Sequence, residues 1–176
     1  PVLEIIVIDN GSDDPRVLAL YDTWRKGSIP FRAEIKSEPF NFSRAVNRGV
    51  AMARGDYVLM LNNDIEIIDP HWLKEMVSCF AWPDTAIVGA KLLYPNGKLQ
   101  HAGIIVGLGG LAEHWFVQQA KDIPGPMGRL WVRQSLSAVT GACMLVSRPA
   151  LDRLGPLNET EFAVAYNDVD LCLRAV

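Results

Sequence analysis

The sequence predicts an α/β fold in which a mostly parallel sheet is flanked by helices. The first observation is the segment from Val2 to Ile8, which is nearly continuously apolar and rich in β-branched residues, as in strands that are buried on both faces. The second is the alternation of such strands with helical patterns, which is typical of parallel strands joined by helical crossovers. The third is size, because 176 residues that are 49% hydrophobic are enough for one domain with its own core.

Four strands are expected in the first half of the chain, separated by three helices. The first helix starts at Asp14-Pro15, since Pro fits the first helical position. A Gly follows each of the first two helical patterns and marks its end. The expected strands span residues 2–9, 31–36, 57–61 and 86–93. The expected helices run from Pro15 to Gly27, from Asn41 or Ser43 to Gly55, and from Pro70 to Phe80.

The second half of the chain predicts a C-terminal mixed β portion. Asn96-Gly97 stands between two apolar runs and is a strong signal for a β-hairpin whose second strand is 99–106. Residues 107–129 are rich in Gly and Pro, which indicates a long, functional loop. A strand over 138–147, a short helix after Pro149 and a last helix from Asn167 to Val176 complete the expected elements.

Charge and cysteine usage exclude several classes of protein. The formal net charge is −3 and there is no block of Lys and Arg, so nothing indicates nucleic-acid binding. Cys79, Cys143 and Cys172 are isolated in apolar segments without a Cys-x-x-Cys pair, so we expect buried, reduced, structural thiols. No apolar run reaches the roughly 18 residues of a membrane span, and no signal peptide opens the chain. These features predict a soluble protein in the cytoplasm or at the inner face of the membrane.

The two ends of the sequence predict that the chain is part of a larger protein. It starts at Pro1 inside the first strand, and it stops at Val176 inside a helical pattern that has no Gly or Pro signal after it. Membrane association is therefore expected only through flanking regions.

Acidic turns follow two of the predicted strands. Asp9 ends the first strand, and Asp64 follows the third beside Asn62 and Asn63. In an open α/β sheet, ligands bind beyond the carboxyl ends of the strands, and no Gly-x-Gly-x-x-Gly or Walker loop is present to cradle a phosphate. A carboxylate at this place can hold Mg²⁺, which takes one or two protein carboxylates besides substrate oxygens. The alternative is that both acids only form turns.

Asp168 lies at the start of the last predicted helix, directly after Asn167. An Asp at such a position is commonly a helix cap or a partner of the helix dipole. The functional alternative is a general base that the helix holds in place. The pattern of residues leaves both alternatives open.

Four motifs follow one another along the chain, over Ile5–Asp14, Asn47–Asp64, Thr140–Arg148 and Asn167–Arg174. Together they resemble the motifs of the family 2 inverting glycosyltransferases, and they occur in that family's order. The second motif ends in a turn that is similar to the family's Asp-x-Asp metal motif. The segment from Gln100 to Trp115 resembles the rhamnosyltransferase-like branch. The likeness covers nearly the whole chain.

The resemblance implies a GT-A fold and one catalytic domain over residues 1–176, with nucleotide binding in about 1–95 and acceptor binding and catalysis in about 96–176. It implies that Asp64 ligates Mn²⁺ or Mg²⁺ and that Asp168 deprotonates the acceptor hydroxyl. The donor would be a nucleotide-diphosphate sugar and the acceptor a saccharide or lipid-linked molecule, in the synthesis of a polysaccharide or cell-surface glycan. The implied donor-binding residues are Asp9 at the nucleobase, Asn41, Asn47 and Asn63, and Gly141 with Ala142 beneath the sugar.

Two positions depart from the family's pattern. Asn62 stands where Asp is common, so metal binding rests on Asp64, and Asn167 stands where Glu usually precedes the base. These departures keep a second hypothesis open, which is a non-catalytic nucleotide-sugar-binding or scaffold module of the same fold. A nucleotidyltransferase is a third alternative, but a Gly-rich phosphate loop would then be expected after the first strand.

Two histidines and two tryptophans surround the Gly-rich segment. A single His, such as His101 or His114, is more often a hydrogen-bonded structural residue than a contact to acceptor or pyrophosphate, and the spacing does not fit a zinc site. For Trp115 and Trp131, packing in the core is the default, and stacking on a sugar ring is the alternative.

Overall fold

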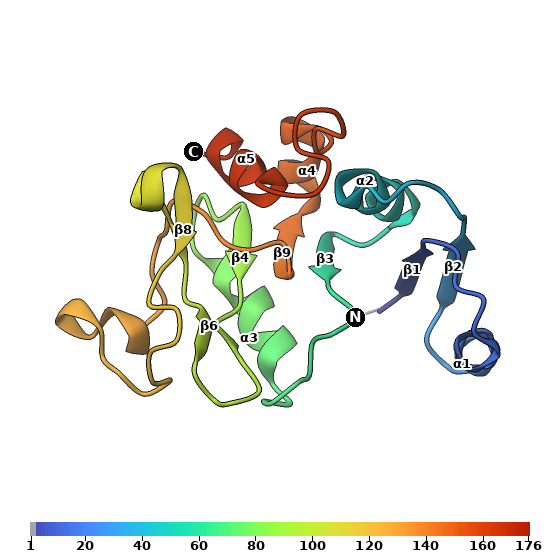
Figure 1. Cartoon of the computed structure of the whole chain (residues 1–176), viewed down its shortest axis with the longest axis horizontal. Helices are drawn as coiled ribbons and strands as arrows, with labels where there is room; N and C mark the ends of the chain where they lie inside the picture. The colour runs from blue at the N-terminus through green and yellow to red at the C-terminus, as the bar shows by residue number, and fades with distance from the viewer. Residues whose placement is uncertain (1–2) are drawn as a thin grey trace. The chain divides into compact units, whose positions relative to one another are not determined.

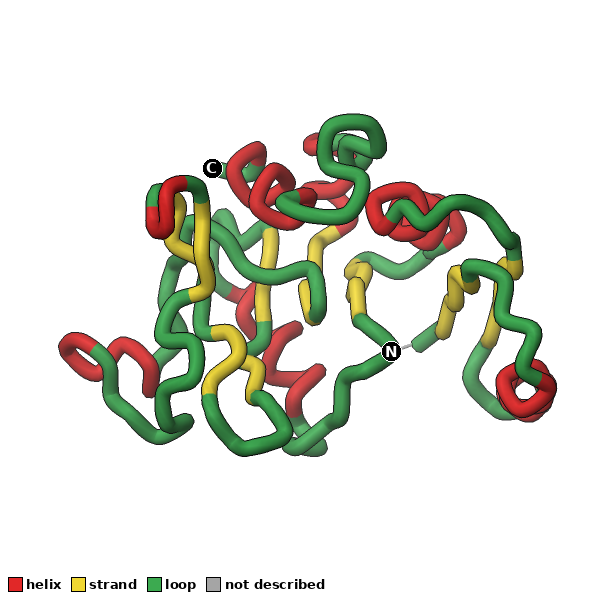
Figure 2. The backbone as a smooth tube through the Cα atoms, in the orientation of Figure 1, coloured by secondary structure: helices red, strands yellow, loops and turns green. Residues whose placement is uncertain are grey.

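The computed structural model describes residues 3–176, in which two compact units are distinguished. Unit 1 consists of Pro1–Val58 and Gly155–Asn167, and unit 2 consists of Leu59–Leu154 and Asp168–Val176. Short strands alternate with helices and loops in both (Figure 2). This division by packing does not coincide with the functional division expected near residue 95, which stays a prediction.

Unit 1 is built on a parallel pair of strands, β1 (Ile5–Asp9) and β2 (Phe31–Ile35). Helix α1 (Pro15–Arg25) is the crossover that such a parallel pair requires (Figure 1). The helix starts where the sequence predicts, because the Asp14 carboxylate accepts the backbone N–H of Arg16 and a Pro occupies the first helical position.

Helix α2 (Phe42–Met52) packs on β1 and carries much of the polar bonding of unit 1. Asn41 is its N-cap, which decides between the two caps expected from the sequence. The fully buried side chain of Ser43 instead donates to the carbonyl of Phe162. The irregular stretch Gly155–Asn167 is in this way tied to α2, although more than a hundred residues separate them in sequence.

A three-stranded sheet has the order β3 (Tyr57–Leu61), β9 (Cys143–Ser147) and β4 (Ile87–Gly89), and all of it from Leu59 onward belongs to unit 2. β4 runs antiparallel to β9. The single strand expected over 86–93 is interrupted, because the chain leaves this sheet after β4 and its next residues, Leu92–Leu93, form β5 in a separate hairpin.

Two antiparallel hairpins follow this sheet along the chain. β5 pairs with β6 (Leu99–His101) across the predicted Asn96-Gly97 turn, where Gly97 has a φ of 76° that favours glycine. β7 (Ile104–Val106) pairs with β8 (Ala112–His114). The expectation of one long loop over 107–129 is therefore wrong at its start, since that part folds back as a strand.

Short helices complete the fold. α3 begins at Trp72 and not at Pro70, because the Asp69 carboxylate accepts the backbone N–H of His71 and forms a turn before the helix. The remaining helices are one or two turns long. Their bounds are α3 (Trp72–Ser78), α4 (Arg148–Leu154) and α5 (Asn167–Arg174), with 3-10 helices η1 (Cys79–Ala81), η2 (Leu108–Gly110) and η3 (Pro126–Trp131).

Two clusters of apolar side chains form the core that we find in unit 2. β9 passes through the middle of the sheet, and Met144 and Val146 on it are fully buried, as expected for an apolar run covered on both faces. One cluster contains Met76, Leu92, Cys143 and Leu145, and the other contains Leu99, Ala102 and Leu130.

The cysteines are free thiols, of which Cys143 and Cys172 are buried and Cys79 is half-buried. The prediction of buried cysteines is thus confirmed for two of the three. Burial raises the pKa of Cys143. No helix within residues 3–176 is long and apolar enough to cross a membrane.

Candidate active site

Residues 138–142 form an irregular stretch that leads into β9 and contains two of the predicted site residues. Gly141 N–H donates to the Asp168 carboxylate over 2.9 Å. The carbonyl of Ala142 accepts the backbone N–H of Asn62, also over 2.9 Å, and Asn62 opens the acidic turn after β3. Unit 2 therefore brings the predicted base, the predicted floor of the sugar site and the start of the predicted metal turn into one network.

The backbone of this stretch is fixed by side chains or backbone groups from several elements. Since the stretch belongs to no regular strand, its N–H groups need partners outside a sheet ladder. Three of the contacts come from other parts of unit 2, and the fourth comes from Thr140 within the stretch. The contacts are Ile104 N–H to Ala138 O at 2.9 Å, Val139 N–H to Cys172 Sγ at 3.5 Å, Thr140 N–H to His101 Nε2 at 3.3 Å, and Ala142 N–H to Thr140 Oγ1 at 3.3 Å.

Asp168 is half-buried in the first turn of α5. One carboxylate oxygen accepts the Gly141 N–H, and the other accepts the N–H of Val169 at 2.8 Å. Each carboxylate oxygen has two lone pairs, so the group can still accept a proton from a bound hydroxyl. The charge of Asp168 also affects Cys172. Burial, with a smaller contribution from Asp168, raises the pKa of Cys172 to about 11.

The turn after β3 carries Asn63 and Asp64, and both side chains are exposed. Within the described part of the chain, the Asp64 carboxylate has no hydrogen bond or ion pair. Among residues 3–176 there is also no group of three or more His, Cys, Asp or Glu side chains that could hold a metal by itself. A single free carboxylate fits Mg²⁺ or Mn²⁺ whose other ligands are substrate oxygens and water, so the donor set is compatible with the implied metal.

His101 and His114 lie side by side in unit 2, at the ends of β6 and β8. Their Nδ1 atoms are 3.1 Å apart and their rings meet edge to face, with centroids at 4.9 Å. Only 1% of the surface of His101 is exposed. Burial, with a smaller effect of His114, lowers the pKa of His101 to about 3. His101 is therefore a neutral structural residue and cannot touch a substrate.

The two tryptophans have different environments. Trp115 is half-buried, with the Arg129 guanidinium over its ring at 5.4 Å from the centroid. Trp131 is 68% exposed and donates its indole N–H to the carbonyl of Asp122. Core packing is thus wrong for Trp131, because it lies on the surface at the end of η3.

Asp9 in unit 1 has both carboxylate oxygens engaged. Oδ1 accepts the backbone N–H groups of Gly11 at 2.9 Å and Ser12 at 2.7 Å, and Oδ2 accepts the hydroxyl of Tyr21 at 2.7 Å. Burial raises the pKa of Asp9, but the hydrogen bonds from Ser12, Tyr21 and Gly11 outweigh it, so that the pKa lies below its ordinary value. This is the turn-forming role that the sequence left open, and the nucleobase contact stays a prediction.

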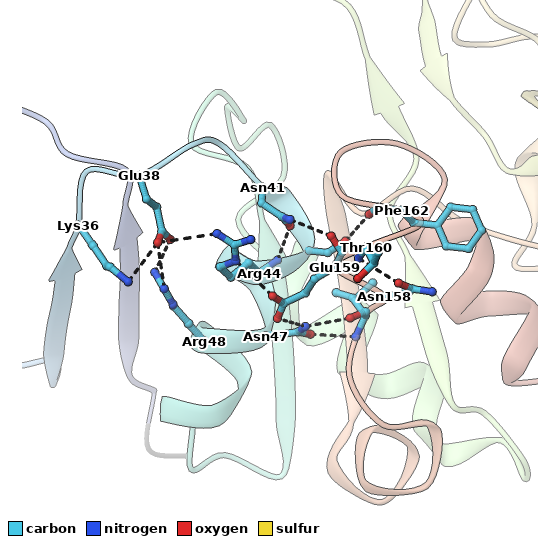
Figure 3. Close-up of polar contacts among 12 residues, drawn as sticks. Lys36, Glu38, Asn41, Arg44, Asn47, Arg48, Asn158, Glu159, Thr160 and Phe162 are labelled. Carbon is cyan, nitrogen blue, oxygen red and sulfur yellow. Dashed lines mark hydrogen bonds and ion pairs between the residues drawn. The ribbon is translucent and has the colours of Figure 1, made fainter.

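Asn41 and Asn47 use their amides to hold the irregular stretch 155–167 on α2 (Figure 3). The Asn41 amide donates to the carbonyl of Glu159 at 2.9 Å, while its oxygen caps the helix. The Asn47 amide donates to the carbonyl of Leu157 and to the Glu159 carboxylate, and its oxygen accepts Leu157 N–H, at 2.8–2.9 Å. Their predicted contact with the nucleoside is not tested by these bonds.

An ion cluster that was not predicted from the sequence also lies along α2. Glu38 contacts Arg48 at 2.6 Å, Lys36 at 3.1 Å and Arg44 at 3.8 Å (Figure 3). Arg44 also contacts Glu159 at 3.2 Å. Arg44 and Arg48 are four positions apart in a predicted helix. This i,i+4 spacing places both on one face of the helix and could have indicated the cluster.

The predicted site residues thus divide between the units. Unit 1 holds Asp9 together with Asn41 and Asn47 on α2, each bonded within that unit. In unit 2, Gly141 and Ala142 connect to Asp168 and to the turn of Asn63 and Asp64.

The chain is similar to known proteins in both sequence and structure. Residues 1–155 match the family described as glycosyl transferase family 2. The chain is 43% identical over 171 residues to protein y4gI of Sinorhizobium fredii, covering 97% of this chain and 19% of that protein. It is 38% identical over 177 residues to the O-antigen biosynthesis protein RfbC of Myxococcus xanthus, covering 99% of this chain and 14% of that protein. The chain thus spans about a fifth or less of these relatives.

A solved structure shares the fold. It is the mannosyltransferase PcManGT from Pyrobaculum calidifontis in complex with GDP-Man and Mn²⁺, with a TM-score of 0.62 at 16% identity. The match covers 96% of this chain and 42% of that one. The predicted GT-A fold is thereby confirmed.

Proposed function

The chain belongs to glycosyl transferase family 2, and we propose that it forms the catalytic part of an enzyme that moves a sugar from a nucleotide-diphosphate sugar to an acceptor hydroxyl with inversion. The acceptor oxygen forms the new bond at the anomeric carbon, and the bond to the diphosphate breaks. Asp168 takes the proton of the acceptor hydroxyl. In-line displacement of this kind inverts the anomeric centre.

The observation that carries the proposal is the contact between Asp168 and Gly141. A general base must be held at hydrogen-bonding distance from the group it deprotonates. Asp168 is fixed by its place in the first turn of α5 and by the Gly141 N–H. That N–H belongs to the stretch predicted to lie under the donor sugar, so the base would stand beside the anomeric carbon.

Asp64 is the proposed ligand of Mn²⁺ or Mg²⁺. Its exposed carboxylate has no competing partner within residues 3–176. When bound, such an ion offsets the charge that develops on the departing diphosphate. Asn63, beside it in the same turn, is proposed to contact the donor.

The relatives suggest the class of donor and product. RfbC is named for O-antigen biosynthesis and the structural neighbour holds GDP-Man, so we propose a nucleotide-sugar donor and a saccharide or lipid-linked acceptor of a surface polysaccharide. GDP-mannose is the first donor to test, with UDP- and dTDP-sugars beside it. The rhamnosyltransferase-like branch and a cytoplasmic location stay predictions.

Replacing Asp168 by Asn in the protein that carries this chain tests the proposal. Asn keeps the shape of the side chain and one oxygen, which can accept only one of the two backbone N–H groups of Gly141 and Val169, and it cannot take a proton. We expect kcat to fall by about 10²- to 10⁴-fold, the usual contribution of a general base, while calorimetry gives an unchanged donor Kd. Asp152→Asn, at an exposed Asp of α4, is the matched control and should keep full activity. If the Asp168→Asn variant kept full turnover, Asp168 would not be the general base.

A non-catalytic sugar-nucleotide-binding or scaffold module is the second candidate. The observation in its favour is that Asn62 and Asn167 stand where the family commonly has acids, beside the proposed metal ligand and the proposed base. A wild-type protein that binds a donor with Mn²⁺ but transfers no sugar to any acceptor, and hydrolyses none, would favour this candidate.

A further inference from the structure

One buried histidine joins the two hairpins of unit 2 to the stretch that carries the proposed base contact. His101 Nε2 lies 3.3 Å from the backbone nitrogen of Thr140, and its Nδ1 lies 3.1 Å from Nδ1 of His114. Thr140 is the residue before Gly141, whose N–H donates to Asp168. His101 is thus connected to the proposed base by two hydrogen bonds, one to Thr140 and one from Gly141 to Asp168.

The partners of His101 determine its tautomer. A backbone N–H can only donate, so Nε2 must accept from Thr140 and carries no proton. Neutral imidazole then has its proton on Nδ1, which donates to Nδ1 of His114. Burial, with a smaller effect of His114, keeps His101 neutral and lowers its pKa to about 3. A charged ring would present two donors and lose the bond from Thr140.

We propose that His101, oriented by His114, is a positioning residue that holds the Thr140–Gly141 backbone so that the Gly141 N–H reaches Asp168. The inference rests on the proposed function in one respect, since it takes Asp168 to be the base. His101 itself is 1% exposed and does not contact substrate.

The physical reason is the cost of an unpaired donor. Thr140 is buried, with 8% of its surface exposed, and a buried N–H without an acceptor destabilises the backbone conformation that leaves it unpaired. The backbone would turn to find another partner. Because consecutive peptide groups move together, Gly141 N–H would then move relative to Asp168. A displacement of about 1 Å at a catalytic group can lower the rate by about 100-fold.

Two variants of similar length test the acceptor. His101→Gln places a side-chain oxygen where it can accept from Thr140, whereas His101→Met cannot accept. We expect kcat of the Met variant to fall by about 10- to 100-fold with the donor KM within about threefold, and the Gln variant to stay within about fivefold of wild type. Equal kcat in both variants would overturn the proposal. His114→Asn, which keeps an acceptor for His101, and His114→Leu, which does not, form a second pair with the same expected order.

Spectroscopy tests the same inference without turnover. Ring-¹⁵N histidine labelling of the protein that carries this chain, with assignment by the His101 variants, should show His101 neutral and protonated at Nδ1. Selective ¹⁵N-glycine labelling should show a shifted Gly141 amide in His101→Met and a nearly unshifted one in His101→Gln. A proton on Nε2 in the wild type, or an unmoved Gly141 amide in His101→Met, would overturn positioning by His101. Both spectroscopic measurements can be made even if the wild type transfers no sugar. The absence of transfer would contradict the proposed function but not the positioning of the Gly141 backbone by His101.

Discussion

The two units differ in how their predicted site residues use their hydrogen-bonding groups. In unit 1 the side chains of Asp9, Asn41 and Asn47 are all engaged by other groups of that unit. In unit 2 the Asp64 carboxylate is exposed and has no partner in the described part of the chain, and Asp168 keeps lone pairs free. Ligand and protein compete for the same donors and acceptors. A polar side chain whose hydrogen bonds are all made within the protein therefore stabilises the fold. A side chain that keeps free acceptors can bind a ligand.

We therefore expect substitutions in the two units to have different effects. Substitutions of the saturated residues in unit 1 should lower stability first. Substitutions of the unsaturated residues in unit 2 should lower donor binding or turnover and leave stability nearly unchanged. Substitutions of Asp64, Asn47 and Tyr21 test this contrast.

The largest effect is expected for Asp64→Asn. If this carboxylate holds the metal, the Mn²⁺-dependent part of donor binding should be lost, which we expect to weaken donor binding by about 100-fold or more because the ion contributes several kcal/mol. Calorimetry with a donor, with and without Mn²⁺, measures it. The free energy of unfolding should change by less than about 0.5 kcal/mol, since the side chain is exposed.

Glu66→Gln is the matched control for Asp64→Asn, because Glu66 is an exposed acid two positions further along the chain. It should keep both donor affinity and its dependence on Mn²⁺. A wild-type protein that binds donor equally well after removal of divalent ions would contradict the role given to Asp64.

Asn47→Ala should act mainly on stability. It removes three hydrogen bonds between α2 and the stretch 155–167, and it leaves the carbonyl and N–H of Leu157 without their partner. We expect a loss of about 2 to 4 kcal/mol in the free energy of unfolding by urea. Donor affinity of the folded fraction should be nearly unchanged.

Asn10→Ala is the control for Asn47→Ala, because Asn10 makes a single exposed hydrogen bond, to the carbonyl of Glu38. It should cost much less than Asn47→Ala. An Asn47→Ala variant of wild-type stability with weakened donor binding would reverse the interpretation and support the nucleoside contact expected from the sequence.

Features set by local chemistry could be predicted from the sequence. The start of α1 follows from Asp14 and the Pro after it, and the β5–β6 hairpin follows from Asn96-Gly97. The split of the strand 86–93 and the pairing of β7 with β8 could not be predicted, because they depend on partners elsewhere in the fold. Residues 138–142 have a strand-like composition, yet their N–H groups bond side chains from β6 and α5 instead of a neighbouring strand.

The candidate site was predictable only as a set of residue types and a resemblance. The family motifs pointed to Asp168 and Gly141 separately, and the structure adds the bond between them. The bond from Thr140 to His101 joins residues 39 positions apart, and that from Asn47 to Leu157 joins residues 110 positions apart. No pattern in the sequence encodes such pairs, since each depends on how distant segments pack.

The smallest effect is expected for Tyr21→Phe, and its pH dependence separates a structural Asp9 from a ligand-binding one. Tyr21 is buried and donates to Asp9 Oδ2, and burial together with Asp9 raises the pKa of Tyr21 to about 12. At pH 7 the variant should lose about 1 to 2 kcal/mol in the free energy of unfolding. Because the folded pKa is raised above the value of about 10 in the unfolded chain, wild type should lose stability from pH 10 to about 12, and the variant should lack this loss. Tyr166→Phe, at an exposed tyrosine, should leave stability at pH 7 unchanged. Parallel alkaline profiles for wild type and Tyr21→Phe would show that the Tyr21–Asp9 bond does not support the fold, and Asp9 would then be available for the nucleobase.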